Sequence, residues 1–417
     1  MNMHSPRPPV VMSEARVSLV GALMVLLGPV SMSLFTPAMP ELVHVFGTTE
    51  SMVKMTLSAY FAGFAVTQLV CGPLSDAYGR KPVTLAFTVI YVGASALAVF
   101  APTAELLIGA RFLQGVGAAV GIAVSRALVR DLFTGEASSR IMNLTSLLMG
   151  LGPAIAPTVG GLLLEALGWQ AIFVFMLLAG LFILAMLQLL LVETVKRDSA
   201  QFRPRTLARS YATLFGDRYF MLASAVLGGG IGAFYTQATI LPFILMDRAG
   251  FTPSQFGLAM LLQSGPFFVG GLIFRGVMAR VGSKRLIPVG IVFMAVGYTS
   301  MFMSMATLAP GLLTVMLPVA AFTFGVAFIM PAMSTATVAP FPHMAGAASA
   351  LSSFLQMGTG FAGGIVVAVI GDPVIGMMVV VPLMGFGAIT AWAIWRRLPE
   401  PALARVVMPP ATPDEPL

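Results

Sequence analysis

The chain has 417 residues, of which 58% are hydrophobic and 9% charged, and its mean hydropathy is +0.94. Soluble domains carry roughly 25% charged residues, so this composition excludes a soluble globular protein and predicts an integral membrane protein. The single cysteine, Cys71, excludes an intrachain disulfide and a cysteine-based metal site. We expect no metal and no cofactor.

Apolar runs recur along the chain and are long enough to cross a bilayer, which takes about 20 residues in a helix. We predict twelve spans, at residues 17–39, 52–74, 83–102, 104–128, 139–165, 170–192, 219–245, 254–279, 285–306, 310–334, 344–370 and 373–395. Continuous runs of this length predict helices, because only helices and closed barrels satisfy all backbone polar groups in lipid. The polar first residues, MNMHSPRPPVVMSEAR, lead directly into the first span and do not resemble a cleavable signal peptide.

The basic residues are concentrated in alternate loops. Placing the N-terminus in the cytoplasm puts 20 of the 23 Lys and Arg residues on that side, as the positive-inside rule requires. Arg111 lies within a span, and Lys54 and Arg248 fall near outer ends, where Lys54 is expected to extend to the water interface. This asymmetry predicts two cytoplasmic termini and explains the net charge of +7 without a nucleic-acid partner.

The longest polar stretch between spans, ETVKRDSAQFRPRTLARSYATLFGDR, lies halfway along the chain. It divides the chain into an N-terminal six-helix bundle (1–192), a cytoplasmic loop (193–218) and a C-terminal six-helix bundle with a short tail (219–417). Two packed bundles around a central path are a common transporter plan. The predicted fold is therefore an all-α polytopic membrane protein with two six-helix bundles.

The loop after the second span, GPLSDAYGRKPV, combines glycines that allow a tight turn with charges that can cap a helix or pair. It resembles the conserved loop of the major facilitator superfamily, G-x-L-a-D-r-x-G-r-k. The matched residues are Asp76, Gly79, Arg80 and Lys81. Ala77 stands where a basic residue is usual. The resemblance implies a charged latch that closes the cytoplasmic side, and Arg130 and Asp131 at the end of the fourth span are expected to take part in it.

The fourth span carries RFLQGVGAAVG, which resembles the R-x-x-Q-G-x-G-A-A motif of drug:proton antiporters. Arg111 and Gln114 are three residues apart and share a helix face. A charge at bilayer depth is costly unless it faces a cavity or a partner, and extension to the outer interface is the alternative. We expect Arg111 to face a cavity and, with Gln114, to act on substrate or coupling ion.

The fifth span carries MGLGPAIAPTVGGLL, which resembles the antiporter motif of that helix. The motif residues are Gly152, Pro153, Pro157, Gly160 and Gly161. Small residues and prolines on one helix create a groove and a kink. The resemblance therefore implies a hinge and favours export over uptake.

Three further stretches, MTLSAYFAGFAVTQLVCGPLSD, SRALVRDLF and FPHMAGAASAL, resemble the bicyclomycin/chloramphenicol-resistance (Bcr/CflA) branch of bacterial multidrug exporters. This resemblance implies a monomer in the inner membrane. It also implies a small-molecule substrate that is exported in exchange for protons.

The first span departs from that branch, which usually reads D-x-Y-L-P-A-x-P with an acid that binds protons and cationic drugs. Here SLFTPAMP places Ser33 at the position of the acid and Phe35 at that of the tyrosine. Serine does not titrate in the useful range, and no other carboxylate falls near a predicted span centre. A net positive core around Arg111 would favour neutral or anionic substrates. The nearest carboxylates that could replace the acid are Glu41, Asp131 and Asp247.

Several polar residues within spans are candidates for the cavity: Ser31, Ser33, Tyr60, Gln68, Gln114, Asn143, Tyr235, Gln237, Gln263 and Gln356. Asn143 and Gln237 are expected where the central helices of the two halves meet. Hydrogen bonding between helices is the alternative role for each residue.

An enzyme is not expected, because the three histidines lie far apart in sequence and no H-E-x-x-H, G-x-S-x-G or P-loop pattern occurs. A channel would need charge rings or a repeated filter, and neither is found. We expect a secondary transporter that exports small amphiphilic compounds, neutral or anionic, by alternating access in exchange for protons. An uptake permease or an uncoupled facilitator of the same fold stays open, because Ser33 replaces the acid.

Overall fold

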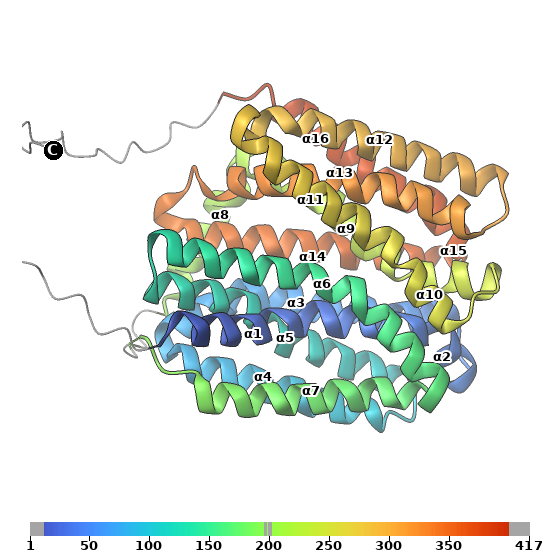
Figure 1. Ribbon diagram of the computed structural model, residues 1–417, viewed down its shortest axis with the longest axis horizontal. Coiled ribbons are helices and arrows are strands. Elements are labelled where there is room, and N and C mark those ends of the chain that lie inside the picture. The colour runs from blue at the N-terminus through green and yellow to red at the C-terminus, as the bar shows by residue number, and fades with distance from the viewer. Residues whose placement is uncertain (1–11, 196–197, 199–201, 400–417) are drawn as a thin grey trace, which may run out of the picture.

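The computed structural model describes residues 12–195, 198 and 202–399, which form long helices joined by short turns (Figure 1). Twelve of these helical segments are long and apolar enough to cross a membrane, so the predicted all-α fold with twelve spans is confirmed. Both terminal segments, and Lys196 and Arg197 of the central loop, lie outside the described residues. The cytoplasmic placement of the termini therefore stays a prediction.

The N-terminal half holds the first six spans. The first comprises α1 (Glu14–Phe35), η1 (Thr36–Ala38) and α2 (Met39–Val45). The next five are α3 (Glu50–Tyr78), α4 (Arg80–Val99), α5 (Ala104–Leu132), α6 (Gly135–Leu167) and α7 (Trp169–Leu190).

The C-terminal half holds the other six spans. They begin with α9 (Arg218–Ala238), which is followed by the π-helical turn η3 (Phe243–Arg248). The next three are α10 with α11 (Pro253–Ala259, Leu261–Val281), α12 (Ser283–Thr307) and α13 (Leu312–Val338). The fifth span of this half consists of η4 (Pro342–Met344) and α14 (Ala345–Ile370). The sixth consists of α15 (Pro373–Ile375), η5 (Gly376–Val380) and α16 (Val381–Trp395).

Local sequence signals account for where the helices begin and for the tight turns that join consecutive spans. The side chain of Thr49 accepts the N–H of Met52 at the start of α3, as N-cap residues do. Gly79 and Gly282 join consecutive spans in the two halves with φ angles of +100° and +88°. Only glycine adopts such angles without strain, so both tight turns depend on it.

Each half has its own apolar core. One cluster of buried side chains comes from the first six spans and the other from the last six, except that Phe243 of η3 is buried in the core of the N-terminal half. The halves meet chiefly where α3 packs against α14 and where α6 packs against α10 and α11. We call the end of the bundle at the α3–α4 turn the basic end, and the end at the α2–α3 turn the opposite end; they lie at the left and right of Figure 1.

One helix was not predicted. α8 (Pro204–Gly216) occupies part of the stretch assigned to the central loop. Proline suits the first turn of a helix, and Leu207, Tyr211 and Leu214 recur at a spacing that forms one apolar face. Leu214 is fully buried, and the Tyr211 hydroxyl donates a hydrogen bond of 2.5 Å to the Leu69 carbonyl of α3. The helix therefore packs at the basic end instead of crossing the membrane.

Candidate functional site

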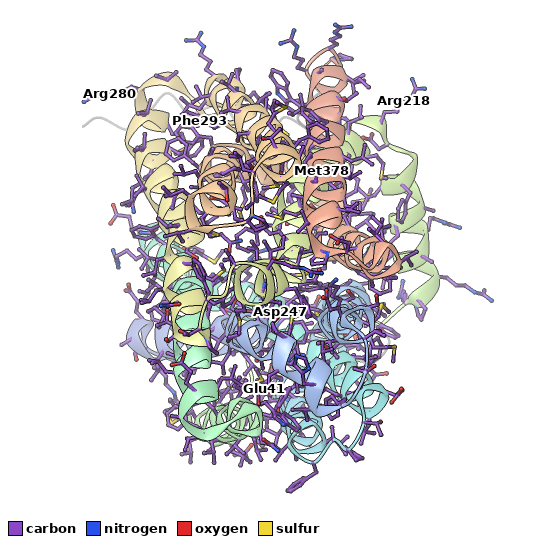
Figure 2. The ribbon with its side chains drawn as sticks, turned by 90° about the vertical axis from the view of Figure 1, so that its right-hand side faces the viewer. Glu41, Arg218, Asp247, Arg280, Phe293 and Met378 are labelled. Atoms are coloured by element: carbon purple, nitrogen blue, oxygen red, sulfur yellow. The ribbon has the colours of Figure 1, made fainter. Side chains whose placement is uncertain are left out.

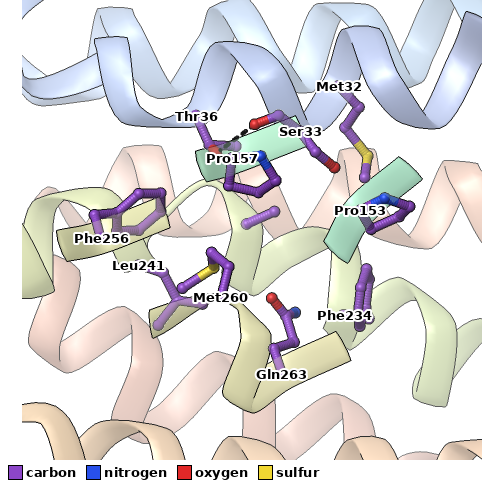
Figure 3. A pocket seen from close by; sticks show the side chains of 11 residues that line it. Met32, Ser33, Thr36, Pro153, Pro157, Phe234, Leu241, Phe256, Met260 and Gln263 are labelled. Carbon is purple, nitrogen blue, oxygen red and sulfur yellow. Dashed lines mark hydrogen bonds between the residues drawn. The ribbon is translucent and has the colours of Figure 1, made fainter. Parts of the chain in front are cut away.

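A narrow cavity of about 20 Å³ lies between the two halves (Figure 3). Its walls come from α1, η1 and α6 on one side and from α9, α10, α11 and the segment after α9 on the other. Eleven residues line it, and none of them is charged. Ser33 and Gln263 are two of its polar residues, and they extend toward the cavity from facing walls (Figure 3).

Arg111 is fully buried inside the N-terminal half and does not line this cavity. Its guanidinium lies between the rings of Phe35 and Tyr60, 4.6 and 4.5 Å from their centroids. One amino group, Nη1, donates to Gln114 Oε1 at 2.7 Å and to the Ser31 carbonyl at 3.4 Å. This differs from the expectation that Arg111 faces the cavity, because the two ring faces and the Gln114 amide enclose it within the bundle. A desolvated cation–π contact contributes about 2 kcal/mol.

The network around Arg111 includes Ser31, which was among the predicted cavity candidates, and Tyr91 and Ser95, which the sequence analysis missed. Gln114 Nε2 donates to Ser95 Oγ at 2.8 Å, and a short hydrogen bond joins Ser31 Oγ to the Tyr91 hydroxyl. Ser31, Tyr91 and Ser95 are polar residues within predicted spans, but their sequence does not reveal which helix face meets Arg111. The network therefore connects the first, third and fourth spans.

Two polar atoms of the Arg111 guanidinium, Nε and Nη2, have no hydrogen-bond partner among the described residues. Arg111 also forms no salt bridge with any residue that the structure describes. The predicted site residue Tyr60 covers one face of the guanidinium and donates to the Gly28 carbonyl at 2.9 Å. A buried charge with two free donors is costly unless it binds a partner, so this network can accept an additional hydrogen-bonding group.

Asn143 and Gln237 do not come together. Asn143 is exposed two turns into α6 from the basic end, where its Oδ1 accepts from Arg275 at 3.5 Å. Gln237 is fully buried in the last turn of α9, and its amide has no hydrogen-bond partner among the described residues. The expectation of a shared location is wrong, because α6 and α9 both start at the basic end and the two residues lie at different heights along them.

At the basic end, Arg80 connects two of the predicted latch residues. Its Nη1 lies 2.5 Å from Asp76 Oδ1, and its Nε lies 3.0 Å from Asp131 Oδ2. Nη1 also donates to Ser75 Oγ at 2.7 Å, and the Arg80 side chain is 3% exposed. Arg130 is exposed. These residues all belong to the N-terminal half, so the contacts tie the α3–α4 turn to the end of α5 and do not join the halves in this conformation.

Glu193, which follows α7, holds the start of α4 and was missed as part of this cluster. Its carboxylate accepts the backbone N–H groups of Arg80 and Lys81 at 2.9 and 3.3 Å. An anion at a helix N-terminus is favourable. A Cβ atom at Gly79 would overlap this carboxylate. The Lys81 ammonium donates to the Gln188 carbonyl at 2.8 Å, which fastens the same turn to α7.

Lys54 is the chief polar link between the halves at the opposite end, onto which Figure 2 looks. The prediction that it extends to the water interface is wrong, because its side chain is 0% exposed. Its ammonium donates to the Gly371 carbonyl at 2.8 Å and to Glu50 Oε2 at 3.0 Å. The ammonium also lies 5.0 Å from the centroid of the Phe243 ring. Gly371 and Phe243 belong to the C-terminal half, so one buried cation contacts both halves.

Asp247 lies at the same junction (Figure 2), in the turn η3. Partial burial raises the pKa of Asp247 above its ordinary value, and the nearby negative charge of Glu50 raises it further. The positive charges of His44, Arg248 and Lys54 act in the other direction. Arg248 Nη2 also lies 3.8 Å from Glu50 Oε1. The opposite end therefore carries a cluster of titratable groups drawn from both halves.

The Gly/Pro motif of α6 lies between α1 and the C-terminal half. Pro153 and Pro157 line the cavity, and α6 stays helical through both. Gly152 and Gly160 face α1, where a Cβ atom on Gly160 would overlap the carbonyl of Leu34. The motif therefore brings α6 close to α1.

On its other face, α6 approaches α10 backbone to backbone. A Cβ atom at Gly161 would overlap the Pro253 carbonyl, and one at Gly257 would overlap the backbone of Thr158. Glu165 Oε1 accepts the Ser254 N–H at 2.9 Å, one turn further along. These contacts, like those of Lys54, close the interface at the opposite end.

The sequence model of the Major Facilitator Superfamily matches residues 21–364. The chain is 30% identical over 338 residues to Multidrug resistance protein D of Escherichia coli (strain K12), covering 80% of this chain and 84% of that protein. It is 28% identical over 365 residues to the Chloramphenicol resistance protein of Pseudomonas aeruginosa, covering 85% and 82%. Among solved structures, a D-xylose-proton symporter superposes with a TM-score of 0.72 at 15% identity, covering 93% of this chain and 98% of that one.

Proposed function

The chain belongs to the Major Facilitator Superfamily, and from this membership we propose that it exports small amphiphilic, drug-like compounds by alternating access. It is a transporter and not an enzyme. The observation that carries the proposal is the cavity between the halves, which is mostly apolar and takes its lining from both. The relatives named for multidrug and chloramphenicol resistance support export, as does the Gly/Pro motif of α6.

In this proposal, two bundles (1–192 and 219–417) joined by residues 193–218 rock about the cavity and expose it to one side at a time. The protein acts as a monomer in the bacterial inner membrane. Its basic end and both termini face the cytoplasm, in keeping with the positive-inside rule. The predicted hinge motif of α6 provides the surface on which α1 and α10 move.

The two ends of the interface play different roles. At the opposite end, the buried Lys54 and the close approach of Gly161 to Pro253 support a state that is closed toward the outside. At the basic end, the contacts of Arg80 with Asp76 and Asp131 stay within one half. We propose that this cluster engages the other half only when the basic end closes in its turn.

In this proposal, protons drive export by binding to a titratable group at the opposite end. Ser33 occupies the position where the family branch usually has an acid, and none of the residues lining the cavity is a carboxylate. Asp247 is the candidate replacement, because its raised pKa means that the closed state binds a proton more tightly than a solvated carboxylate would. A proton taken up from outside would therefore favour closure of that end, as exchange of protons for substrate requires.

A second candidate function is uptake or uncoupled facilitation by the same fold. It is favoured by one observation: Ser33, which does not titrate, lines the cavity where the family branch usually has an acid. If this position is the only one that couples transport to protons, substrate will move without them.

Proton movement in reconstituted vesicles separates these functions. A pH-sensitive dye inside the vesicles reports protons while phenicol-like neutral compounds or aryl carboxylates are added. Proton flux that requires substrate, and that Asp247→Asn removes, supports proton-coupled export. Substrate movement with no proton flux would replace it with uncoupled facilitation, and the absence of transport of any amphiphile would contradict the proposed function as a whole.

A further inference from the structure

We propose that the cavity selects neutral amphiphiles that carry a carbonyl-type hydrogen-bond acceptor, and that the amide of Gln263 recognises this acceptor. This inference rests on the proposed function, because it concerns the same cavity. It goes further by naming the residue that selects the substrate and the chemical class that it selects.

The first observation is the state of the Gln263 side chain. Gln263 lies near the start of α11 and is 6% exposed. Its Nε2 group is itself buried and has no hydrogen-bond partner among the described residues, and Gln263 is one of the residues that line the cavity. Buried amide groups are nearly always hydrogen-bonded. An unpartnered donor on a residue that lines a cavity therefore points to a ligand atom that this amide reaches when the ligand enters, and a donor requires an acceptor.

The second observation is the absence of charge. None of the eleven residues that line the cavity is charged, and Arg111 lies inside the N-terminal half, enclosed by Phe35 and Tyr60. A charged ligand would lose its hydration without gaining an ion pair, which is strongly unfavourable. The neutral class is thus favoured over the anionic class that a cavity-facing Arg111 would have attracted.

The apolar side chains of the cavity walls can contact the apolar part of such a ligand. The rings of Phe234 and Phe256 and the side chains of Met32 and Met260 line the cavity. Methionine is unbranched and adapts its shape to irregular ligands. Ser33 is on the facing wall (Figure 3) and offers a hydroxyl that can both donate and accept. A ligand held by Gln263 and Ser33 would therefore contact both halves at once.

The test is binding of three dansyl probes that share one fluorophore and its sulfonyl group and differ in the group on the sulfonamide nitrogen, which sets their charge. Dansylamide is neutral with sulfonyl acceptors, dansylglycine is a carboxylate, and dansyl-ethylenediamine is an ammonium. Their fluorescence with purified full-length protein in detergent gives a Kd for each. We expect dansylamide to bind at least about tenfold more tightly than the other two. Equal or tighter binding of dansylglycine, or no binding of any probe, would overturn the inference.

Variants then assign the effect to Gln263. Gln263→Leu, which removes the donor but fills similar space, should weaken dansylamide binding about 5- to 100-fold, as expected for one lost hydrogen bond. Gln263→Glu should turn the preference toward the ammonium probe. Gln170→Leu, an exposed glutamine outside the cavity lining, should bind like the unmodified protein. Unchanged dansylamide binding by Gln263→Leu overturns the role of Gln263, and Gln263→Met gives a second test if the leucine variant misfolds.

Binding in detergent does not depend on transport, so the two proposals can fail separately. Selective binding of dansylamide without export from vesicles would contradict the proposed function and leave the binding site in place. Export that Gln263→Leu does not alter would contradict the role of Gln263 and leave export in place.

Discussion

The ammonium of Lys54 donates a hydrogen bond of 2.8 Å to the carbonyl of Gly371, a residue 317 positions away in the sequence. This bond joins α3 of the N-terminal half to the turn after α14 of the C-terminal half. The Lys54 side chain is completely buried between them. The bond closes the interface at the opposite end, and the proposed role of this end as a gate can be tested directly.

Lys54→Met should open that gate. A hydrogen bond to a charged group contributes about 1.5–3 kcal/mol, so the closed-to-open ratio should fall roughly 10- to 100-fold, since each 1.4 kcal/mol is tenfold. Spin labels at Val45 and Ile375, which are 47% and 46% exposed on the two halves, report the separation of that end by pulsed electron resonance. The buried Cys71 is first replaced by serine. Arg209→Met on the exposed face of α8 is the control, and an unchanged distance distribution in Lys54→Met would refute the gate.

The same gate should respond to pH through Asp247. Its pKa is raised in the closed state above the ordinary 3.8, so the closed state binds the proton more tightly than an open, solvated one. Closure is therefore favoured as pH falls through the raised pKa and is weakened as pH rises above it. The spin-label distances are measured between about pH 4 and pH 8. Asp247→Asn should remove part of the pH response that the exposed Glu105→Gln retains; equal responses in the two variants would exclude Asp247.

Arg111→Ala should abolish transport, and Arg111→Lys should reduce it. Lysine keeps the charge but not the planar group that lies between the Phe35 and Tyr60 rings. Drug efflux from intact cells and the thermal unfolding midpoint are measured together. Wild-type efflux by Arg111→Ala would contradict a role in transport. A large fall in Tm with matching loss of efflux would assign Arg111 to folding alone.

Gly79→Ala should destabilise the turn at the basic end. At φ +100° an L-residue is strained by about 1–3 kcal/mol, and the added Cβ would meet the Glu193 carboxylate. Gly72→Ala is the matched control, because it lies within α3 with open space around it. There alanine should stabilise the helix by up to about 1 kcal/mol. Thermal unfolding in detergent compares the two, and equal midpoints would show that the turn tolerates a side chain.

Gly161→Ala should prevent the opposite end from closing while the protein stays folded. The added methyl group would overlap the Pro253 carbonyl of α10, and a close-packed interface cannot absorb it without separation. Gly150→Ala on the same helix meets no atom within 4 Å and serves as the control. We expect at least a ~10-fold loss of efflux for Gly161→Ala, a shift that corresponds to about 1.4 kcal/mol. Normal efflux by that variant would show that this contact is not needed for transport.

The sequence by itself determined the number of spans and their type, because a bilayer demands about 20 apolar residues of every crossing helix. The pairing of Asp76 with Arg80 was also predictable, since the two residues lie four positions apart, whereas the contribution of the distant Glu193 was not. The helix α8 was not, because its apolar face is narrow and its overall composition is polar. Family motifs located Arg111 and Gln114 but not Tyr91 or Ser31, which bond to the same network.

Only the tertiary structure decided which faces meet. Helical periodicity tells which residues share a face, but it does not tell which neighbour that face contacts. The sequence therefore placed Lys54 at the water interface, whereas the packing of η3 and Gly371 against α3 buries it. In the same way, Arg111 became part of the N-terminal core and Gln263 became the unpartnered donor of the cavity, because helices far apart in sequence closed around them.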